Sequence, residues 1–213
     1  MLRVDSFTIY HSSNAYLGSI LAERALAGLP VELVRRPLCV PKERGIWVSD
    51  LVGGRSNARQ GDYNREDCLR WAARHGIEMR FAPNDELARR VARWRAAPRA
   101  REELAARTYY AALGSGREAA LDGALFRAGY VDLTDVNDES VVRRAIESAG
   151  LEPDDLLARA NGPEAQRLLD AALADFDRLA CPGTPTFVFE GERFWGKDRV
   201  DWLADAVRRR IAG

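Results

Sequence analysis

The sequence has few of the residues that build metal, redox or disulfide sites. Only three of its 213 residues are cysteines, and Cys39, Cys68 and Cys181 form no Cys-x-x-Cys pair. An odd number of scattered cysteines argues against both a disulfide framework and a dithiol redox centre, so we expect reduced, structural thiols. The two histidines, His11 and His75, have no second ligand at metal-binding spacing, which argues against a metal site.

Long hydrophobic runs and an excess of one charge are also missing. No apolar stretch approaches the ~20 residues of a membrane span, and the first residues enter a strand-like pattern rather than the apolar core of a signal peptide. The 32 basic side chains balance the 32 acidic ones. Composition therefore points to neither nucleic acid nor a membrane as a partner, and we expect a cytoplasmic location.

Arginines are nevertheless concentrated in one segment. Seven of them lie between Arg89 and Arg107, around Trp94, and acidic residues interrupt the cluster. A basic patch can indicate nucleic-acid binding, but the interruptions and the zero net charge favour a solvated helix face or a partner surface.

The N-terminal segment predicts a β-α-β unit. Residues 3–10 alternate as a strand buried on both faces, and the small polar run at residues 11–14 is suited to capping a helix. Gly28 and Pro30 end that helix, and residues 31–35 predict a second strand. A helical crossover favours parallel pairing of the two strands.

The middle of the chain is helical. Residues 37–61, rich in proline, glycine and polar side chains, predict a connecting loop in which a substrate would be recognised. Apolar residues at helical spacing then predict helices over 63–75, 85–96, 100–113, 117–128, 139–149, 154–159 and 163–179.

The C-terminal segment predicts a β-hairpin and a terminal helix. Strands are expected over 186–189 and 193–195, with an amphipathic helix after them that Asp198 is placed to cap. Pro185 opens the first of these strands, and a cis bond from Thr184 would turn the Thr184 backbone toward whatever lies beside the sheet.

Two motifs in this segment carry a family resemblance. Gly183-Thr-Pro-Thr-Phe187 and Phe194-Trp-Gly-Lys-Asp-Arg199 resemble the closing half of the DsbA-like thioredoxin fold. More narrowly, they resemble the 2-hydroxychromene-2-carboxylate isomerases and the kappa-class glutathione transferases. The resemblance implies glutathione as cofactor and an aromatic-derived or conjugated small molecule as substrate, and it is compatible with a homodimer.

The two ends of the chain together predict the fold. A lone β-α-β unit has an unpaired sheet edge and an uncovered face, which a hairpin and a helix supply. We therefore predict an α/β chain with a thioredoxin-like domain at 1–36 plus 180–213. A large all-helical insertion is expected over 62–179, with 37–61 as the connecting loop.

The same resemblance assigns a catalytic serine. The run Ser12-Ser-Asn-Ala-Tyr-Leu17 is similar to the family motif Ser-Pro-aromatic-Ser-Tyr-Leu, which places Ser12 on the serine that holds the sulfur of glutathione as a thiolate. Ser13, Asn14 and Ala15 depart from the motif. A simpler interpretation is that Ser12 or Ser13 only caps the helix.

Further residues follow from the resemblance. Thr184, before Pro185, corresponds to the residue whose backbone pairs with glutathione, and Lys197 and Asp198 correspond to the pair that receives its γ-glutamyl end. An N-cap role is an alternative for Asp198, and the two roles can coexist.

The resemblance also assigns a substrate side. It places Asn14, Phe81 and Asn84 there, although Asn84 also fits turn chemistry. Gln60 stands where the family commonly has a lysine, so one cation of the family pattern is missing.

Two functional hypotheses follow. One is a glutathione-dependent isomerase or transferase; the other is a non-catalytic thioredoxin-fold protein that holds a peptide along Thr184. Affinity for glutathione separates them.

Overall fold

The structure is a computed structural model that describes residues 1–41 and 58–213, without the side chains of residues 58–60. Most of the expected connecting loop and the side chain of Gln60 therefore lie outside the described residues. The chain forms two compact units. The first joins Met1–Leu38 to Asp170–Gly213, and the second is Cys39–Leu169.

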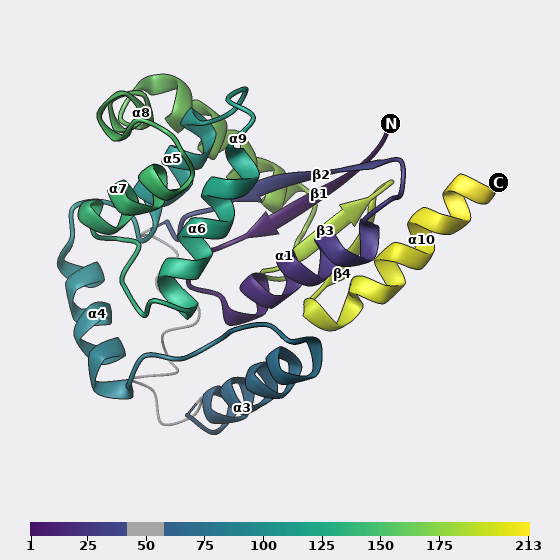
Figure 1. The fold of residues 1–213 in the computed structure, drawn as a ribbon, viewed down its shortest axis with the longest axis horizontal. Helices are drawn as coiled ribbons and strands as arrows, with labels where there is room; N and C mark the ends of the chain where they lie inside the picture. The colour runs from purple at the N-terminus through teal and green to yellow at the C-terminus, as the bar shows by residue number, and fades with distance from the viewer. Residues whose placement is uncertain (42–57) are drawn as a thin grey trace. The chain divides into compact units, whose positions relative to one another are not determined.

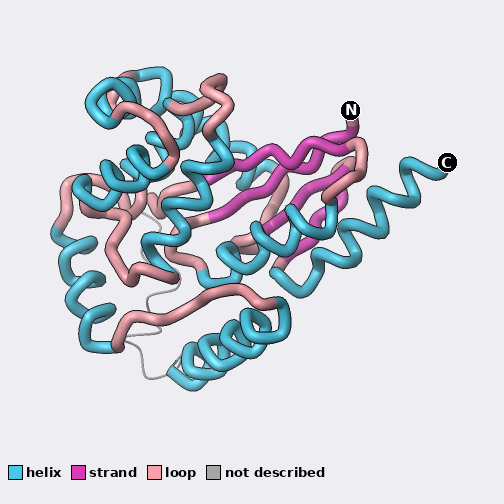
Figure 2. The backbone as a smooth tube through the Cα atoms, in the orientation of Figure 1, coloured by secondary structure: helices cyan, strands magenta, loops and turns pink. Residues whose placement is uncertain are grey.

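The first unit is built on a mixed sheet, drawn as arrows in Figure 1 and in magenta in Figure 2. Among the described residues its strands are β1 (Leu2–Thr8), β2 (Val31–Pro37), β3 (Thr186–Phe189) and β4 (Glu192–Trp195), in the order β2-β1-β3-β4. β1 pairs with β2 in parallel and with β3 antiparallel, and β3 pairs with β4 as a hairpin. The parallel crossover and the hairpin are confirmed, as is an α/β chain with helices between its two β segments.

Helices cover both faces of this sheet. On one face lie α1 (Ser13–Leu26) and α10 (Val200–Ala212), with α1 against Phe187 of β3. The last part of α9 (Pro163–Arg178) covers the other face, where the rings of Phe176 and Phe7 meet edge to face at 5.7 Å. Because β1 is central, its side chains are buried on both sides, as the sequence pattern indicates.

The second unit is helical (Figure 1). Its helices within the described residues are α3 (Ala58–His75), α4 (Asn84–Ala96), α5 (Glu103–Ala111), α6 (Glu118–Tyr130), α7 (Glu139–Ser148), α8 (Pro153–Ala160) and the first turns of α9. Each of these helices was expected from the sequence, with different ends. In particular, α5 begins three residues late because Glu102 adopts a left-handed conformation at φ 65°. No helix in the part of the chain that the structure describes is long and apolar enough to cross a membrane.

The arginine-rich segment departs from the expected solvated face. Arg90 and Arg101 are each only 8% exposed. Arg90 donates hydrogen bonds to the backbone oxygens of Leu133 and Thr134 and to Glu86. For these two residues the expectation of a solvated face is wrong, because both side chains are buried in the helical unit.

Candidate functional site

Ser12 stands at the junction of β1 and α1. It has extended backbone angles and is the N-cap of α1, with its Oγ accepting a hydrogen bond from the amide of Ala15 at 3.2 Å. Of the two candidate caps, Ser12 is therefore the residue that caps α1. Ser12 is only 8% exposed. The same hydroxyl donates to the backbone oxygen of Thr184 at 3.2 Å. Capping therefore fixes the hydroxyl close to a segment 172 residues away.

The Thr184–Pro185 peptide bond is cis, as the sequence predicts. Pro185 packs directly on α1, since a Cβ built on Gly18 would lie 2.7 Å from Pro185 Cγ. The backbone oxygen of Pro185 accepts from the amide of Gly196 at 2.9 Å, and the Thr186 hydroxyl donates to the Gly183 oxygen at 2.6 Å. The turn before β3 is therefore held on several sides.

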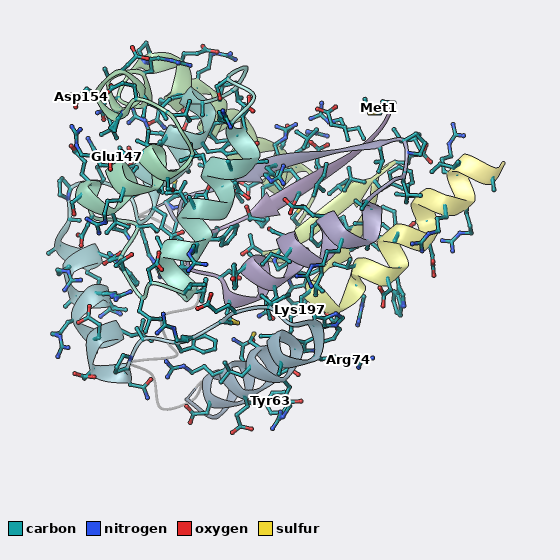
Figure 3. The ribbon with its side chains drawn as sticks, viewed as in Figure 1. Met1, Tyr63, Arg74, Glu147, Asp154 and Lys197 are labelled. Atoms are coloured by element: carbon teal, nitrogen blue, oxygen red, sulfur yellow. The ribbon has the colours of Figure 1, made fainter. Side chains whose placement is uncertain are left out.

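Lys197 makes a further contact that connects this turn to α1. It follows Gly196 in a short 3-10 helix (Lys197–Arg199) and is only 6% exposed. Figure 3 labels Lys197 beside the N-terminal end of α10. Its Nζ donates to Oδ1 of Asn14 in the first turn of α1 at 2.9 Å. Ser12, Thr184, Pro185 and Lys197, which the resemblance assigns to glutathione, thus lie together within the first unit. Asn14, which the resemblance assigns to the substrate side, joins them through Lys197.

Asp198 belongs to the same turn but does not cap α10. Its carboxylate pairs with Arg199 at 2.6 Å, and Arg199 is the residue that precedes the first turn of α10. The N-cap interpretation of Asp198 is wrong because a 3-10 turn intervenes before the helix. The side chain instead folds over Gly196, where a Cβ would lie 2.5 Å from Asp198 Oδ1. Gly196 has φ 104°, so glycine suits that position on both counts.

The local field at Ser12 favours a negative charge. The N-terminus of a helix carries about half a positive charge, and no acidic side chain lies in the first turn of α1 to offset it. A group that accepts a hydrogen bond at this position is stabilised most when it is an anion.

The cysteines of the chain take no part in this arrangement. Cys39, Cys68 and Cys181 form no disulfide, and all three are buried. Burial raises the pKa of the Cys181 thiol to about 11, so that thiol stays protonated near neutral pH. Residues 11–14 contain no cysteine. The position where a strand meets a helix N-terminus carries a hydroxyl in place of a thiol.

Phe81 and Asn84 belong to the second unit, where Arg65 contacts both. The Arg65 guanidinium lies 4.9 Å from the centre of the Phe81 ring and also bonds to Asn84 Oδ1. Arg65 Nη2 donates to the Ala82 oxygen at 2.5 Å. The sequence interpretation missed Arg65, because an arginine on an exposed helix carries no local signal for such contacts. A substrate role for Phe81 and Asn84 stays a prediction.

The model of the DsbA-like thioredoxin domain matches residues 3–208. The chain belongs to this family. A solved 2-hydroxychromene-2-carboxylate isomerase is similar at 18% identity, with a TM-score of 0.77, over 99% of this chain and 96% of the other. A probable DsbA oxidoreductase from Streptomyces coelicolor is similar at 21% identity, with a TM-score of 0.76, over 100% and 91%.

A third similar structure is the cytosolic disulfide reductase DsbM from Pseudomonas aeruginosa, at 18% identity and a TM-score of 0.65, over 99% of this chain and 97% of the other. No curated protein sequence matches significantly. At these identities the solved structures establish the fold of this DsbA-like chain and confirm the predicted fold class.

Proposed function

We propose that this DsbA-like chain is a glutathione-dependent isomerase or transferase that acts on an aromatic-derived or conjugated small molecule. The observation that carries the proposal is the Ser12 hydroxyl, fixed at the N-cap of α1 and 3.2 Å from the backbone oxygen that precedes cis-Pro185. A dithiol oxidoreductase needs a thiol at this position, and the chain has none there. The names of the similar isomerase and oxidoreductase structures support an enzyme in general.

The chemistry of the residues around Ser12 supports glutathione as the proposed cofactor. Bound glutathione would supply a thiolate that adds reversibly to a conjugated carbon of the substrate. In the proposal the Ser12 hydroxyl donates to the sulfur and, with the positive end of α1, holds it unprotonated. A hydrogen bond to a charged acceptor is worth ~1.5–3 kcal/mol, which lowers a thiol pKa by about one to two units.

The rest of the turn would orient the tripeptide. The Thr184 backbone offers polar groups at the start of β3, where an extended peptide can pair. Asp198 is half exposed and suits the γ-glutamyl ammonium, while Lys197 holds Asn14 and with it the first turn of α1. A carboxylate paired with an ammonium forms a charge-assisted hydrogen bond, which is stronger than a neutral one.

Thermal unfolding with glutathione tests the proposal. A ligand at ~100 times its dissociation constant adds about 2.7 kcal/mol, which raises the melting temperature by roughly 5 °C or more in a chain of this size. Asp198→Ala should reduce the shift. Asp205→Ala is the matched control, because Asp205 lies on the adjoining helix α10 and likewise pairs with a nearby arginine, Arg208.

Ser12→Ala should behave differently from Asp198→Ala. It removes the donor to the sulfur, so glutathione should still bind while its thiol pKa rises, seen as lower thiolate absorbance at neutral pH. If millimolar glutathione changes neither the melting temperature nor the thiol pKa, the enzyme proposal fails. A non-catalytic protein that holds a peptide along Thr184 would then replace it.

A further inference from the structure

The second unit buries an arginine whose hydrogen-bonding groups lack partners. Nε and Nη1 of Arg101 are inaccessible to solvent and have no hydrogen-bond partner among the described residues. Buried polar groups are almost always paired, and a guanidinium offers five N–H donors and no acceptor. The described part of the chain therefore leaves Nε and Nη1 of Arg101 without a hydrogen-bond acceptor.

Two carboxylates lie near Arg101 without hydrogen-bonding to it. Glu102 Oε1 is 3.8 Å from Arg101 Nε, which is too long for a hydrogen bond. Asp135 instead accepts from Trp94 Nε1 at 3.1 Å and from Asn137 Nδ2 at 2.8 Å. Burial lowers the pKa of Arg101 to about 10 despite both carboxylates. A hydrogen-bond acceptor close to the guanidinium would satisfy donors that the ion pair with Glu102 leaves without one.

Arg101 also lines a small cavity within this unit. The cavity has a volume of about 40 Å³, and its wall includes Trp94, Arg99, Ala100, Leu104 and Asn137. One water needs only ~10–15 Å³ of such space, so the cavity holds several non-hydrogen atoms. The guanidinium carbon of Arg101 lies over the Trp94 ring, 3.7 Å from its centre, a cation–π contact.

The backbone beside the cavity is unusual as well. Glu102 is a buried, non-glycine residue in the left-handed region, at φ 65°. Its amide donates to Asn137 Oδ1 at 2.6 Å, which ties this conformation to the cavity wall. Strained backbone of this kind tends to collect at ligand-binding sites.

We propose that this cavity binds a small carboxylate. Arg101 on the wall favours an anionic oxygen, and Ala100 and Leu104 suit a short apolar remainder. Arg99 lies at the exposed side of the wall, where its Nη2 donates to Asn161 Oδ1 at 2.9 Å. The small volume and the neighbouring carboxylate of Glu102 disfavour a bulky dianion such as sulfate. The site lies in the helical unit, and the proposal does not depend on glutathione binding.

Titration with sodium acetate, against sodium chloride at equal ionic strength, tests this site. The protein is labelled with 15N-arginine, and the Nε–Hε resonances and the melting temperature are followed. We expect one Nε–Hε resonance to shift with saturation at millimolar acetate, and the melting temperature to rise with the same dependence. Arg101→Lys should remove that resonance and weaken binding at least tenfold, whereas Arg95→Lys, on the exposed side of α4, should leave it unchanged.

A second variant tests the same cavity without replacing Arg101, so the result does not depend on whether the Arg101→Lys protein folds. Ala100→Leu fills the cavity from a half-buried position and leaves the guanidinium in place, so it should abolish the acetate response. If acetate gives no saturable shift, water alone occupies the cavity and the proposal fails. An equal response to chloride, or an unchanged response in Ala100→Leu, would also overturn it.

Discussion

At the scale of single residues, Ser12 connects the start of α1 with the turn before β3. Its hydroxyl caps α1 and contacts the turn before β3, in a place where the helix end contributes positive charge. The strength of that field can be measured without any ligand, because a thiol placed there reports it through its pKa.

Ser12→Cys should create a thiol with a lowered pKa. An ordinary cysteine titrates near 8.5, and a helix N-terminus lowers this, so we expect a pKa of about 7.5 or below. The measurement is the pH dependence of alkylation, with the wild-type rate subtracted. Ser148→Cys is the control, because Ser148 is the exposed last residue of α7, where the helix end carries the opposite sign. If the thiol introduced by Ser12→Cys has a pKa at or above that of the Ser148→Cys thiol, the proposed field is refuted.

A second residue-scale prediction concerns Glu86. Hydrogen bonds from Arg90 and then Arg89 lower the pKa of the Glu86 carboxyl from 4.5 to about 2. A lowered folded-state pKa stabilises the protein fully above pH 4.5 and loses that effect as the pH falls through 2. After allowance for partial exposure, Glu86→Gln should cost about 1 kcal/mol at pH 7.

Chemical denaturation at several pH values checks the direction of the pH dependence that Glu86 gives to stability. The difference between wild type and Glu86→Gln should shrink steadily below pH 4.5 and be nearly gone at pH 2. Glu66→Gln, which removes an exposed pair with Arg70, should change stability by less than about 0.5 kcal/mol at any pH. A loss of stability in Glu86→Gln that persists undiminished at pH 2 would contradict the lowered pKa of Glu86.

At the scale of elements, the close approach of α1 to Pro185 is the feature that positions Ser12. Gly18→Ala would put a methyl group 2.7 Å from Pro185 Cγ, which forces α1 and the turn apart. Overpacking of this kind costs ~1–3 kcal/mol, more than the ~1 kcal/mol that alanine gains in a helix. We expect a net loss of stability together with weaker glutathione binding, measured by thermal unfolding and titration.

Gly123 provides the comparison. It lies inside α6, and a Cβ there meets nothing within 4 Å, so Gly123→Ala should raise stability by ~0.5–1 kcal/mol. Opposite signs for the two glycine substitutions would establish the close contact at Gly18. If Gly18→Ala instead raised stability, the turn at Pro185 would have to move aside for the added methyl group at little cost.

The elements also show how far the sequence can be interpreted. Strand alternation, helical spacing and the crossover length predicted the sheet and the hairpin, because these signals are local or follow from chain connectivity. The cis bond was predicted from the position of Pro185 at the start of a strand and from the family resemblance around Thr184. The burial of Arg101, the cap of α10 and the contacts of Arg65 were not predicted. Each of these depends on side chains that meet only after folding, which a linear pattern does not record.

At the scale of the whole molecule, the arrangement of thiols predicts the absence of dithiol chemistry. The three cysteines of the chain are buried in different segments. We expect no reduction of insulin and slow reaction with a thiol reagent in the native state, with three equivalents reacting at once after unfolding in guanidinium. Turnover in the insulin assay that is abolished by Cys68→Ser or Cys181→Ser would overturn this expectation.

The hydroxyl of Ser12 has a single proton, and in the folded chain that proton is already directed at the Thr184 oxygen. An anion that accepts a hydrogen bond from Ser12 must replace the Thr184 oxygen as the acceptor. The hydroxyl therefore points to Thr184 in the free site and to the anion in the liganded site. The displaced oxygen then becomes an acceptor for an N–H of the incoming molecule. The change of acceptor thus makes two contacts depend on each other. A ligand that only accepts a hydrogen bond leaves the Thr184 oxygen without a donor, whereas a peptide thiol can pair with both the Ser12 hydroxyl and the Thr184 oxygen.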